Sequence, residues 1–258
     1  MVGRHKLQAL VLSRRNIGEA DRLVTLFTRE QGLVKAIAKG VRKIPSRRGG
    51  HLEPYTMVLT LISATRAGNY VSAVETMRAY QDLQLDKRVL PVVRNIALSV
   101  TSFFEEGQVQ PTLFDAIAHA WDILPSLDDQ RRALLEMAVA IHALELAGVM
   151  PDMDRCQVCR TTNPREAVVL DGAAGGFRCL LCQGGFMDTE YSFPGHLLKV
   201  IRFIQNSPER VLKLSLSPAA VTHLLLAWRR YMAHVTEQPI FMEPQTYPQG
   251  MSLSTIQT

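Results

Sequence analysis

The chain has 258 residues, of which 47% are hydrophobic and 21% are charged, which is enough for two or three modules with a buried core. No apolar run approaches the roughly 20 residues that span a bilayer, and none follows the first basic residues as in a signal peptide, so we expect a soluble, intracellular protein. The net charge of +5 is unevenly placed: residues 1–80 hold 14 Lys and Arg against five Asp and Glu and carry +9, whereas the remainder carries −4. A basic N-terminal third predicts a polyanionic ligand, and the alternative is a solvated basic face that binds nothing.

The first 80 residues predict a small all-β domain. Short runs rich in Val, Leu, Ile, Thr and Ala, separated by turn-forming residues, predict strands at 6–14, 21–28, 33–39, 54–62 and 69–76. Five such strands favour an OB-fold, a small barrel that commonly holds single-stranded nucleic acid, and an SH3-like barrel fits the periodicity almost as well. Residues 40–50, GVRKIPSRRGG, have no apolar periodicity and predict a mobile basic loop.

After residue 82 the apolar residues recur at steps of three and four, which indicates helices. We expect helices at 89–104, 112–124, 128–146, 195–206 and 218–235. Thr112 and Asp115 form a variant of the capping box at the start of the second helix. Asp128 or Asp129 caps the third, which ends at Gly148 and has an apolar set broad enough for a central helix. Ser217 caps the last helix, and residues 237–258 predict a loosely held tail.

All four cysteines lie in two CxxC motifs, and 19 residues separate Cys159 from Cys179. This spacing is typical of a four-thiolate zinc site, in which each motif supplies half of a tetrahedral shell. Two disulfides or a redox-active CxxC are the alternatives; a reducing cytosol opposes the first, and the pairing of two equal motifs opposes the second. We therefore expect one Zn²⁺ held by Cys156, Cys159, Cys179 and Cys182, with a structural role because the coordination shell is closed.

The sequence contains no motif that predicts catalysis. It has no Walker A sequence and no HExxH, and residues 172–176 do not fit a dinucleotide-binding loop. The pairs Glu105-Glu106 and Asp128-Asp129 have no third acid at a workable spacing and are typical of a helix surface and a helix start. We expect a binding protein rather than an enzyme.

The chain resembles the bacterial RecO family of recombination mediators. The resemblance is carried by IGEADRLVTLFTREQGLVKAIAKGVRK at 17–43, Ser46-Arg47, LEPYT at 52–56, and ALELAGVMP at 143–151, which leads into the first CxxC. It implies an α+β multidomain protein: an OB-fold at 1–80, a helical domain at 81–150 and 193–236, and an inserted zinc module at 151–192, with the tail at 237–258 outside the resemblance.

The resemblance also implies a function. Members of this family bind single- and double-stranded DNA, anneal complementary strands without ATP, and act with RecR to help RecA replace the single-strand binding protein SSB. A cytoplasmic location, at the nucleoid when DNA is bound, follows. The competing reading of the residues is a zinc-ribbon factor that binds nucleic acid in transcription or RNA metabolism, and a nuclease would need clustered acids that the sequence lacks.

The expected DNA-binding residues are basic and lie on the barrel or its loop, because annealing needs neutralised phosphates without locked bases. They are Arg14, Arg15, Lys35, Lys39, Arg42, Lys43, Arg47, Arg48 and Arg66. Lys35 and Lys39 are four apart on one strand and so share a sheet face. The family's pocket for the acidic, Phe-ended C-terminal tail of SSB has a basic rim, and Arg131 and Arg132, beside Leu134 and Leu135, are its candidate counterparts.

Overall fold

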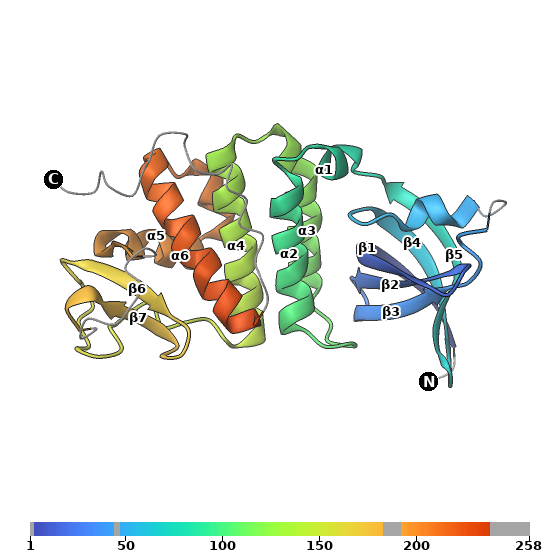
Figure 1. Ribbon diagram of the computed structural model, residues 1–258, viewed down its shortest axis with the longest axis horizontal. Coiled ribbons are helices and arrows are strands. Elements are labelled where there is room, and N and C mark those ends of the chain that lie inside the picture. The colour runs from blue at the N-terminus through green and yellow to red at the C-terminus, as the bar shows by residue number, and fades with distance from the viewer. Residues whose placement is uncertain (1–2, 44–46, 183–191, 238–258) are drawn as a thin grey trace. The chain divides into compact units, whose positions relative to one another are not determined.

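The computed structural model describes residues 3–43, 47–182 and 192–237 (Figure 1). They form two compact units, one ending at Ser126 and the other beginning at Leu127. The first unit holds the predicted barrel and three helices, and the second holds the remaining helices and the cysteine motifs. The predicted domain boundaries stay a prediction, and the predicted tail lies outside the described residues except for Glu237. Within the described ranges, no helix is long and apolar enough to cross a membrane.

A closed five-stranded barrel forms the N-terminal part of the first unit. Its strands are β1 (Gly3–Ile17), β2 (Asp21–Thr28), β3 (Gly32–Ala38), β4 (Met57–Thr65) and β5 (Gly68–Arg78). The spatial order is β1-β2-β3-β5-β4, with β4 returning to β1. All neighbours are antiparallel except β3 and β5, which meet in parallel at Ile37 and Tyr70. This Greek-key order confirms the OB-fold prediction and decides against the SH3-like alternative.

The long β1 closes the barrel by pairing with two neighbours in turn. Its first half, from Gly3 to Leu10, pairs with β4, and its second half pairs with β2 up to the turn at Ile17. The register shifts after Val11, which lets the strand bend between its two partners. Alternate residues face the barrel core, such as Val34, Ala36 and Ala38 on β3.

The basic segment at 40–50 differs from the predicted loop. Val41 and Leu52 are buried in the barrel core, and η1 (Arg47–Leu52) is a short 3₁₀ helix. The prediction rested on missing periodicity, but two apolar residues eleven positions apart are enough to fix both ends of the segment against the core. Arg42 and Lys43 therefore directly follow a residue that is buried in the barrel core, whereas residues 44–46 of the predicted loop lie outside the described residues.

Three helices complete the first unit: α1 (Gln81–Leu85), α2 (Leu90–Phe103) and α3 (Pro111–Ile123), which is followed by η2 (Leu124–Ser126). The buried Trp121 of α3 meets the rings of Tyr55 and Tyr80 edge-on, with centroids 5.8 and 5.7 Å apart. These two tyrosines flank β4 and β5, so one tryptophan ties α3 to the barrel.

The predicted cap of α3 is wrong. The N-cap residue is Gln110, without a side-chain cap, and Pro111 occupies the first turn. Asp115 instead accepts hydrogen bonds from Arg29 of the barrel at 2.9 and 3.0 Å. Because α3 begins at Pro111, Asp115 lies beyond the first helical turn and pairs with Arg29 instead of capping the helix.

The second unit is built around α4 (Asp129–Ala147), which contacts α5 (Leu198–Asn206) and α6 (Pro218–Thr236). The predicted helices are confirmed, although residues 195–197 form η5 (Gly195–Leu197) and η6 (Pro208–Lys213) precedes α6. Asp128 caps α4 by accepting from the backbone N–H of Arg131 at 2.8 Å, and Gly148 ends the helix with φ 72°.

The charged pair Glu136 and Arg229 joins α4 to α6 inside the second unit. Arg229 donates two hydrogen bonds to the Glu136 carboxylate, at 2.9 and 2.7 Å, and both side chains are 4% exposed. Trp228 of α6 is also buried. Such a pair specifies the packing of two helices because either charge alone would be costly to bury.

The cysteine motifs lie on a small sheet in the second unit. The sheet consists of β6 (Ala167–Asp171), β7 (Gly176–Cys179) and the two-residue β8 (Phe193–Pro194), in the order β7-β6-β8, and η3 (Leu180–Cys182) follows β7. The antiparallel pair β6 and β7 forms a hairpin between the two CxxC motifs. Arg202 of α5 donates to the carbonyls of Met153, Asp154 and Thr162. These hydrogen bonds fix the segment that contains the first CxxC motif to the helices.

Candidate nucleic-acid interface and metal centre

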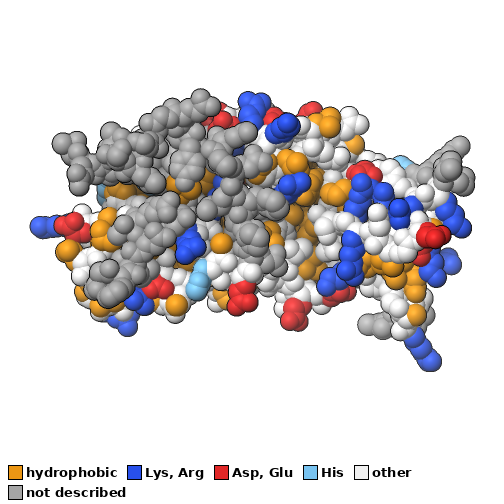
Figure 2. Space-filling model, viewed as in Figure 1, with side chains coloured by type: hydrophobic (Ala, Val, Ile, Leu, Met, Phe, Trp, Pro, Cys, Tyr) orange, Lys and Arg blue, Asp and Glu red, His pale blue; other side chains and the backbone are white. Residues whose placement is uncertain are grey.

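Lys and Arg side chains gather over the barrel, as Figure 2 shows for one face. Most of the predicted DNA-binding residues lie near one end of the barrel, where the β1–β2 turn meets the segment that follows β3. Arg66 lies apart, in the exposed turn between β4 and β5. The side chains of Arg47 and Arg48 lie outside what the structure describes, although their backbone belongs to η1.

Of the two lysines predicted on one strand, Lys35 lies on the outward side of β3, whereas Lys39 lies in the turn directly after the strand's last residue, Ala38. Lys35 and Lys39 are exposed, while the residues that alternate with them are buried. The Lys35 ammonium lies 3.6 Å from a carboxylate oxygen of Glu106, and the Lys39 ammonium lies 4.9 Å from the ring centre of Tyr70. The two cations therefore both face solvent, where a phosphodiester chain can reach them.

A second group of cations surrounds the β1–β2 turn. Arg14 forms an ion pair with Glu53, and an Arg22 nitrogen lies 3.7 Å from the same carboxylate. Arg42 donates to the carbonyl of Gly18 at 3.0 Å. Burial, followed by the positive charge of Arg14, lowers the pKa of Arg22 from its usual value. Arg15 and Lys43 are exposed beside this group.

Sequence reasoning missed Arg22, the most central cation of this group. Arg22 lies opposite Asn16 across the β1–β2 hairpin and opposite Ala38 on β3. Arg22 could have been predicted from the sequence. If the two predicted strands on either side of the turn pair as a hairpin, Arg14 and Arg22 lie near one another. Arg4 and Lys6, exposed at the start of β1, were also left out and lie beside the end of β4.

Aromatic side chains contribute little to this surface. Phe27 is fully buried, and Tyr55 packs against Trp121, where burial raises the pKa of its hydroxyl. Tyr70, unlike Phe27 and Tyr55, lies beside an exposed lysine, Lys39. The geometry therefore favours contacts with phosphates over stacking on bases.

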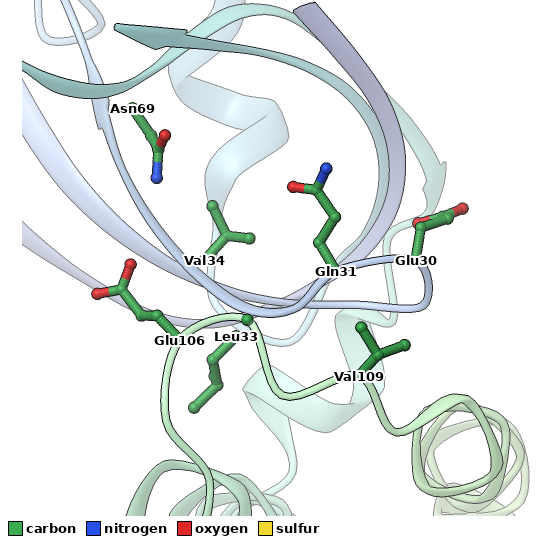
Figure 3. Close-up of a pocket in the computed structure, with 8 residues that line it drawn as sticks. Glu30, Gln31, Leu33, Val34, Asn69, Glu106 and Val109 are labelled. Carbon is green, nitrogen blue, oxygen red and sulfur yellow. The ribbon is translucent and has the colours of Figure 1, made fainter. Parts of the chain in front are cut away.

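An acidic pocket limits the basic surface at the start of β3 (Figure 3). It has a volume of about 370 Å³, and Glu30 and Glu106 line it together with the apolar Leu33, Val34 and Val109. The Glu30 carboxylate accepts from the backbone N–H of Gln8 at 3.0 Å. These carboxylates repel phosphate, so a polyanion on the barrel is directed toward Lys39 and the arginines.

The four cysteines come together as the spacing predicted. Their sulfur atoms all lie within 4.8 Å of one another, and no other group of His, Cys, Asp or Glu in the described ranges offers a comparable metal site. Backbone N–H groups of Cys179 and Val158 point to the Cys156 sulfur at 3.3 and 3.5 Å. This set of four sulfurs with N–H donors fits a thiophilic metal ion.

The electrostatics of the cluster also fit a cation. Burial opposes the thiolate form of Cys156, but the backbone N–H donors outweigh it and lower the pKa of this thiol to about 6. Burial and the neighbouring sulfurs of Cys156 and Cys159 raise the pKa of Cys179. Four thiolates this close repel one another unless a metal ion lies between them.

The two arginines considered for a partner site differ in exposure. The Arg131 side chain is 55% exposed and lies 3.1 Å from Asp128, whereas the Arg132 side chain is only 6% exposed and lies 2.8 Å from Asp129. Leu134 and Leu135 are buried. Of the two arginines, Arg131 alone presents its charge to solvent at the start of α4.

Two family models match the chain. One, described as recombination protein O N terminal, matches residues 1–80, and the other, recombination protein O C terminal, matches residues 96–240. The DNA repair protein RecO of Dehalococcoides mccartyi is 25% identical over 235 residues, covering 90% of this chain and 91% of the relative. That of Thermobifida fusca is 31% identical over 179 residues, covering 68% and 72%. That of Rubrobacter xylanophilus is 27% identical over 204 residues, covering 79% and 82%.

Proposed function

Because the chain belongs to the RecO family of DNA repair proteins, we propose that it is a recombination mediator that anneals complementary DNA strands. With RecR, it helps RecA to replace SSB on single-stranded DNA. The observation that carries this proposal is the group of exposed or half-exposed cations on the OB-fold, around Arg14, Lys39 and Arg42. It acts in the cytoplasm and at the nucleoid when bound to DNA.

The barrel would bring two strands together by neutralising their phosphates. Each Lys or Arg that contacts a phosphate releases condensed counterions, and this lowers the repulsion between two approaching strands. Because few aromatic residues lie on the surface, the bases of a bound strand stay available for pairing. Lys39 and Lys43 lie on a turn at the barrel end and suit both single and double strands. This chemistry needs no catalytic group, and we propose that the protein is not an enzyme.

The four cysteines would hold one Zn²⁺ in a structural role. Cys156 and Cys159 come from the first CxxC motif, and Cys179 and Cys182 come from the second. Four thiolates fill a tetrahedral shell, so the ion has no open position for an activated water. The metal would join the β6–β7 hairpin to the first CxxC motif, so that the two form one module in the second unit.

The proposed partner surface for the SSB tail is the start of α4. Arg131 is exposed there and can attract an acidic peptide. A charge reversal, Arg131→Glu, is expected to weaken binding of an acidic, Phe-ended peptide several-fold in a fluorescence-anisotropy titration. Arg210→Glu, an exposed arginine of η6, is the matched control. Equal peptide affinities for the Arg131 variant and the wild type would reject this site.

Strand annealing tests the proposed function. Complementary oligonucleotides coated with SSB are mixed with the protein in the absence of nucleotide and magnesium. We expect faster duplex formation than with SSB alone, with no cleavage of either strand. A zinc-ribbon transcription factor would bind without annealing, and a nuclease would shorten the strands once magnesium is added. No acceleration over SSB alone would contradict the proposal.

A further inference from the structure

Two arginines contact one carboxylate at the end of the barrel, and Arg42 lies at the same β1–β2 turn, where it donates to the Gly18 carbonyl. Arg14 of β1 and Arg22 of β2 both contact the same Glu53 oxygen. Arg42 lies close enough to Arg22 to lower its pKa, after burial and Arg14. Asp21, the first residue of β2, accepts from the backbone N–H of Gly40 at 2.8 Å. The group therefore has three guanidiniums, of which Arg14 and Arg22 are paired with the carboxylate of Glu53.

Hydrogen bonds to groups other than Glu53 hold two of these arginines in place. Arg22 donates to the carbonyl of Gly49 and to the side chain of Asn16, both at 3.4 Å. The Arg42 guanidinium donates to the Gly18 carbonyl, and the Arg42 backbone N–H donates to the Ala20 carbonyl at 3.0 Å. A second anion at this place would therefore meet guanidiniums that are already positioned, which lowers the entropic cost of binding.

Solvent reaches the group although it is partly buried. The side chains of Arg14 and Glu53 are 28% and 35% exposed, and that of Arg22 is 18% exposed. In such surroundings the net positive charge is screened less than on an open surface. Guanidiniums bind phosphate and carboxylate oxygens with the same fork geometry, so a phosphate can take the place of the carboxylate.

We infer that Arg14, Arg22 and Arg42 form a phosphodiester-binding site, and that Glu53 is its internal counter-ion, which a DNA phosphate displaces. The inference rests on the proposed function and adds Arg22 to the DNA contacts and a regulatory role for Glu53. In the free protein, Glu53 neutralises part of the cluster and keeps the arginines together. On binding, the protein exchanges this ion pair for a phosphate contact, so Glu53 lowers the affinity for DNA.

The variant Glu53→Gln tests the inference, with Glu75→Gln as its control. Both substitutions add the same charge to the barrel, but Glu75 is an exposed residue of β5 outside the arginine group. Single-stranded oligonucleotide binding is measured by anisotropy over a range of salt concentrations. We expect Glu53→Gln to bind about fivefold tighter than wild type at low salt, because no internal carboxylate competes with the phosphate for the arginines. Glu75→Gln should change affinity less than about twofold.

A second pair of variants keeps the inference testable if Glu53→Gln does not fold, which its thermal melt would show. Arg22→Gln should weaken DNA binding about fivefold and make the salt slope shallower by about 0.7. Arg29→Gln removes a more exposed arginine, which is paired with Asp115. This variant should change the DNA affinity and the salt slope less than Arg22→Gln does. Binding by Glu53→Gln that is no tighter than by Glu75→Gln, or an Arg22→Gln variant that binds like Arg29→Gln, overturns the inference. Failure of the wild type to bind DNA rejects the proposed function itself.

Discussion

Gly32 is the residue at which β3 meets the segment that follows α2. Its φ of 66° suits glycine, and a Cβ built there would lie 1.8 Å from the Gln108 carbonyl oxygen. The backbone N–H of Gly107 also bonds to the Leu33 carbonyl at 3.2 Å. A side chain at residue 32 would push this segment off the strand, and with it Glu106 and its contact to Lys35.

We expect Gly32→Ala to lower the free energy of unfolding by more than about 2 kcal/mol, because it adds a steric clash to backbone strain. Gly18→Ala is the control for strain alone: Gly18 has φ 55°, and a Cβ there would meet no atom within 4 Å. Its cost should be about 1 kcal/mol. Urea denaturation followed by circular dichroism measures both values. Equal costs for the two variants would show that the close approach at Gly32 does not matter.

Charge reversal at the barrel end is expected to weaken DNA binding. Lys39→Glu and Arg42→Glu should each reduce affinity for a single-stranded oligonucleotide about tenfold, because each replaces an attraction to phosphate by a repulsion. Lys199→Glu, at an exposed lysine of α5, makes the same charge change outside the barrel. An affinity of the barrel variants equal to that of Lys199→Glu would remove this surface from the DNA interface.

The sequence allowed prediction of candidate cations but not of their counter-ions. Alternation along β3 was enough to place Lys35 on the exposed side of the strand, whereas Lys39 lies just beyond its end. Glu53, by contrast, lies 39 residues from Arg14 in the chain, and their contact arises only because barrel closure brings β1 and the residues before β4 together. The four cysteines needed no such closure, because each CxxC fixes half of the site locally.

At the scale of elements, periodicity predicted the long strands and helices and failed for short ones. β8 has two residues and α1 has five, which is too short for an apolar repeat. The parallel pairing of β3 with β5 also leaves no local signal, because it joins strands separated by β4. The cap of α3 failed for another reason, since Asp115 is used by Arg29 across the unit.

The cysteine module should depend on its metal. We expect a zinc chelator to lower the melting temperature of the wild type by at least about 5 °C, because metal binding contributes directly to the stability of a small site. Cys182→Ser should bind less zinc, melt at a lower temperature, and respond little to the chelator. Metal content by mass spectrometry and melting by circular dichroism provide the two readouts. A wild type that holds no zinc and ignores the chelator would contradict a structural metal site.

At the scale of the whole molecule, the excess of positive charge is concentrated in the N-terminal third of the chain, which is the part that we expect to bind DNA. Residues 1–80 carry +9 and the rest carry −4, so DNA is attracted to one module and repelled weakly by the other. This asymmetry explains how a protein with a net charge of only +5 can present a strongly basic surface to a polyanion.

We expect the affinity for single-stranded DNA to fall steeply with salt. Four to five phosphate contacts predict a slope of about −3 in a plot of log affinity against log salt concentration. Base composition should have little effect, since the barrel surface offers few stacking partners. Titrations with oligonucleotides of two compositions between low and moderate salt measure both effects. A slope near zero, or a strong preference for one composition, would contradict a phosphate-dominated interface.

The two tryptophans are divided between the compact units. Trp121 is buried in the first and Trp228 in the second, and the chain has no other. Each unit therefore has its own intrinsic fluorophore. A Trp121→Phe chain emits only from the helices around Trp228, and a Trp228→Phe chain emits only from the junction of α3 with the barrel. The unfolding of each unit can thus be followed optically in the intact protein.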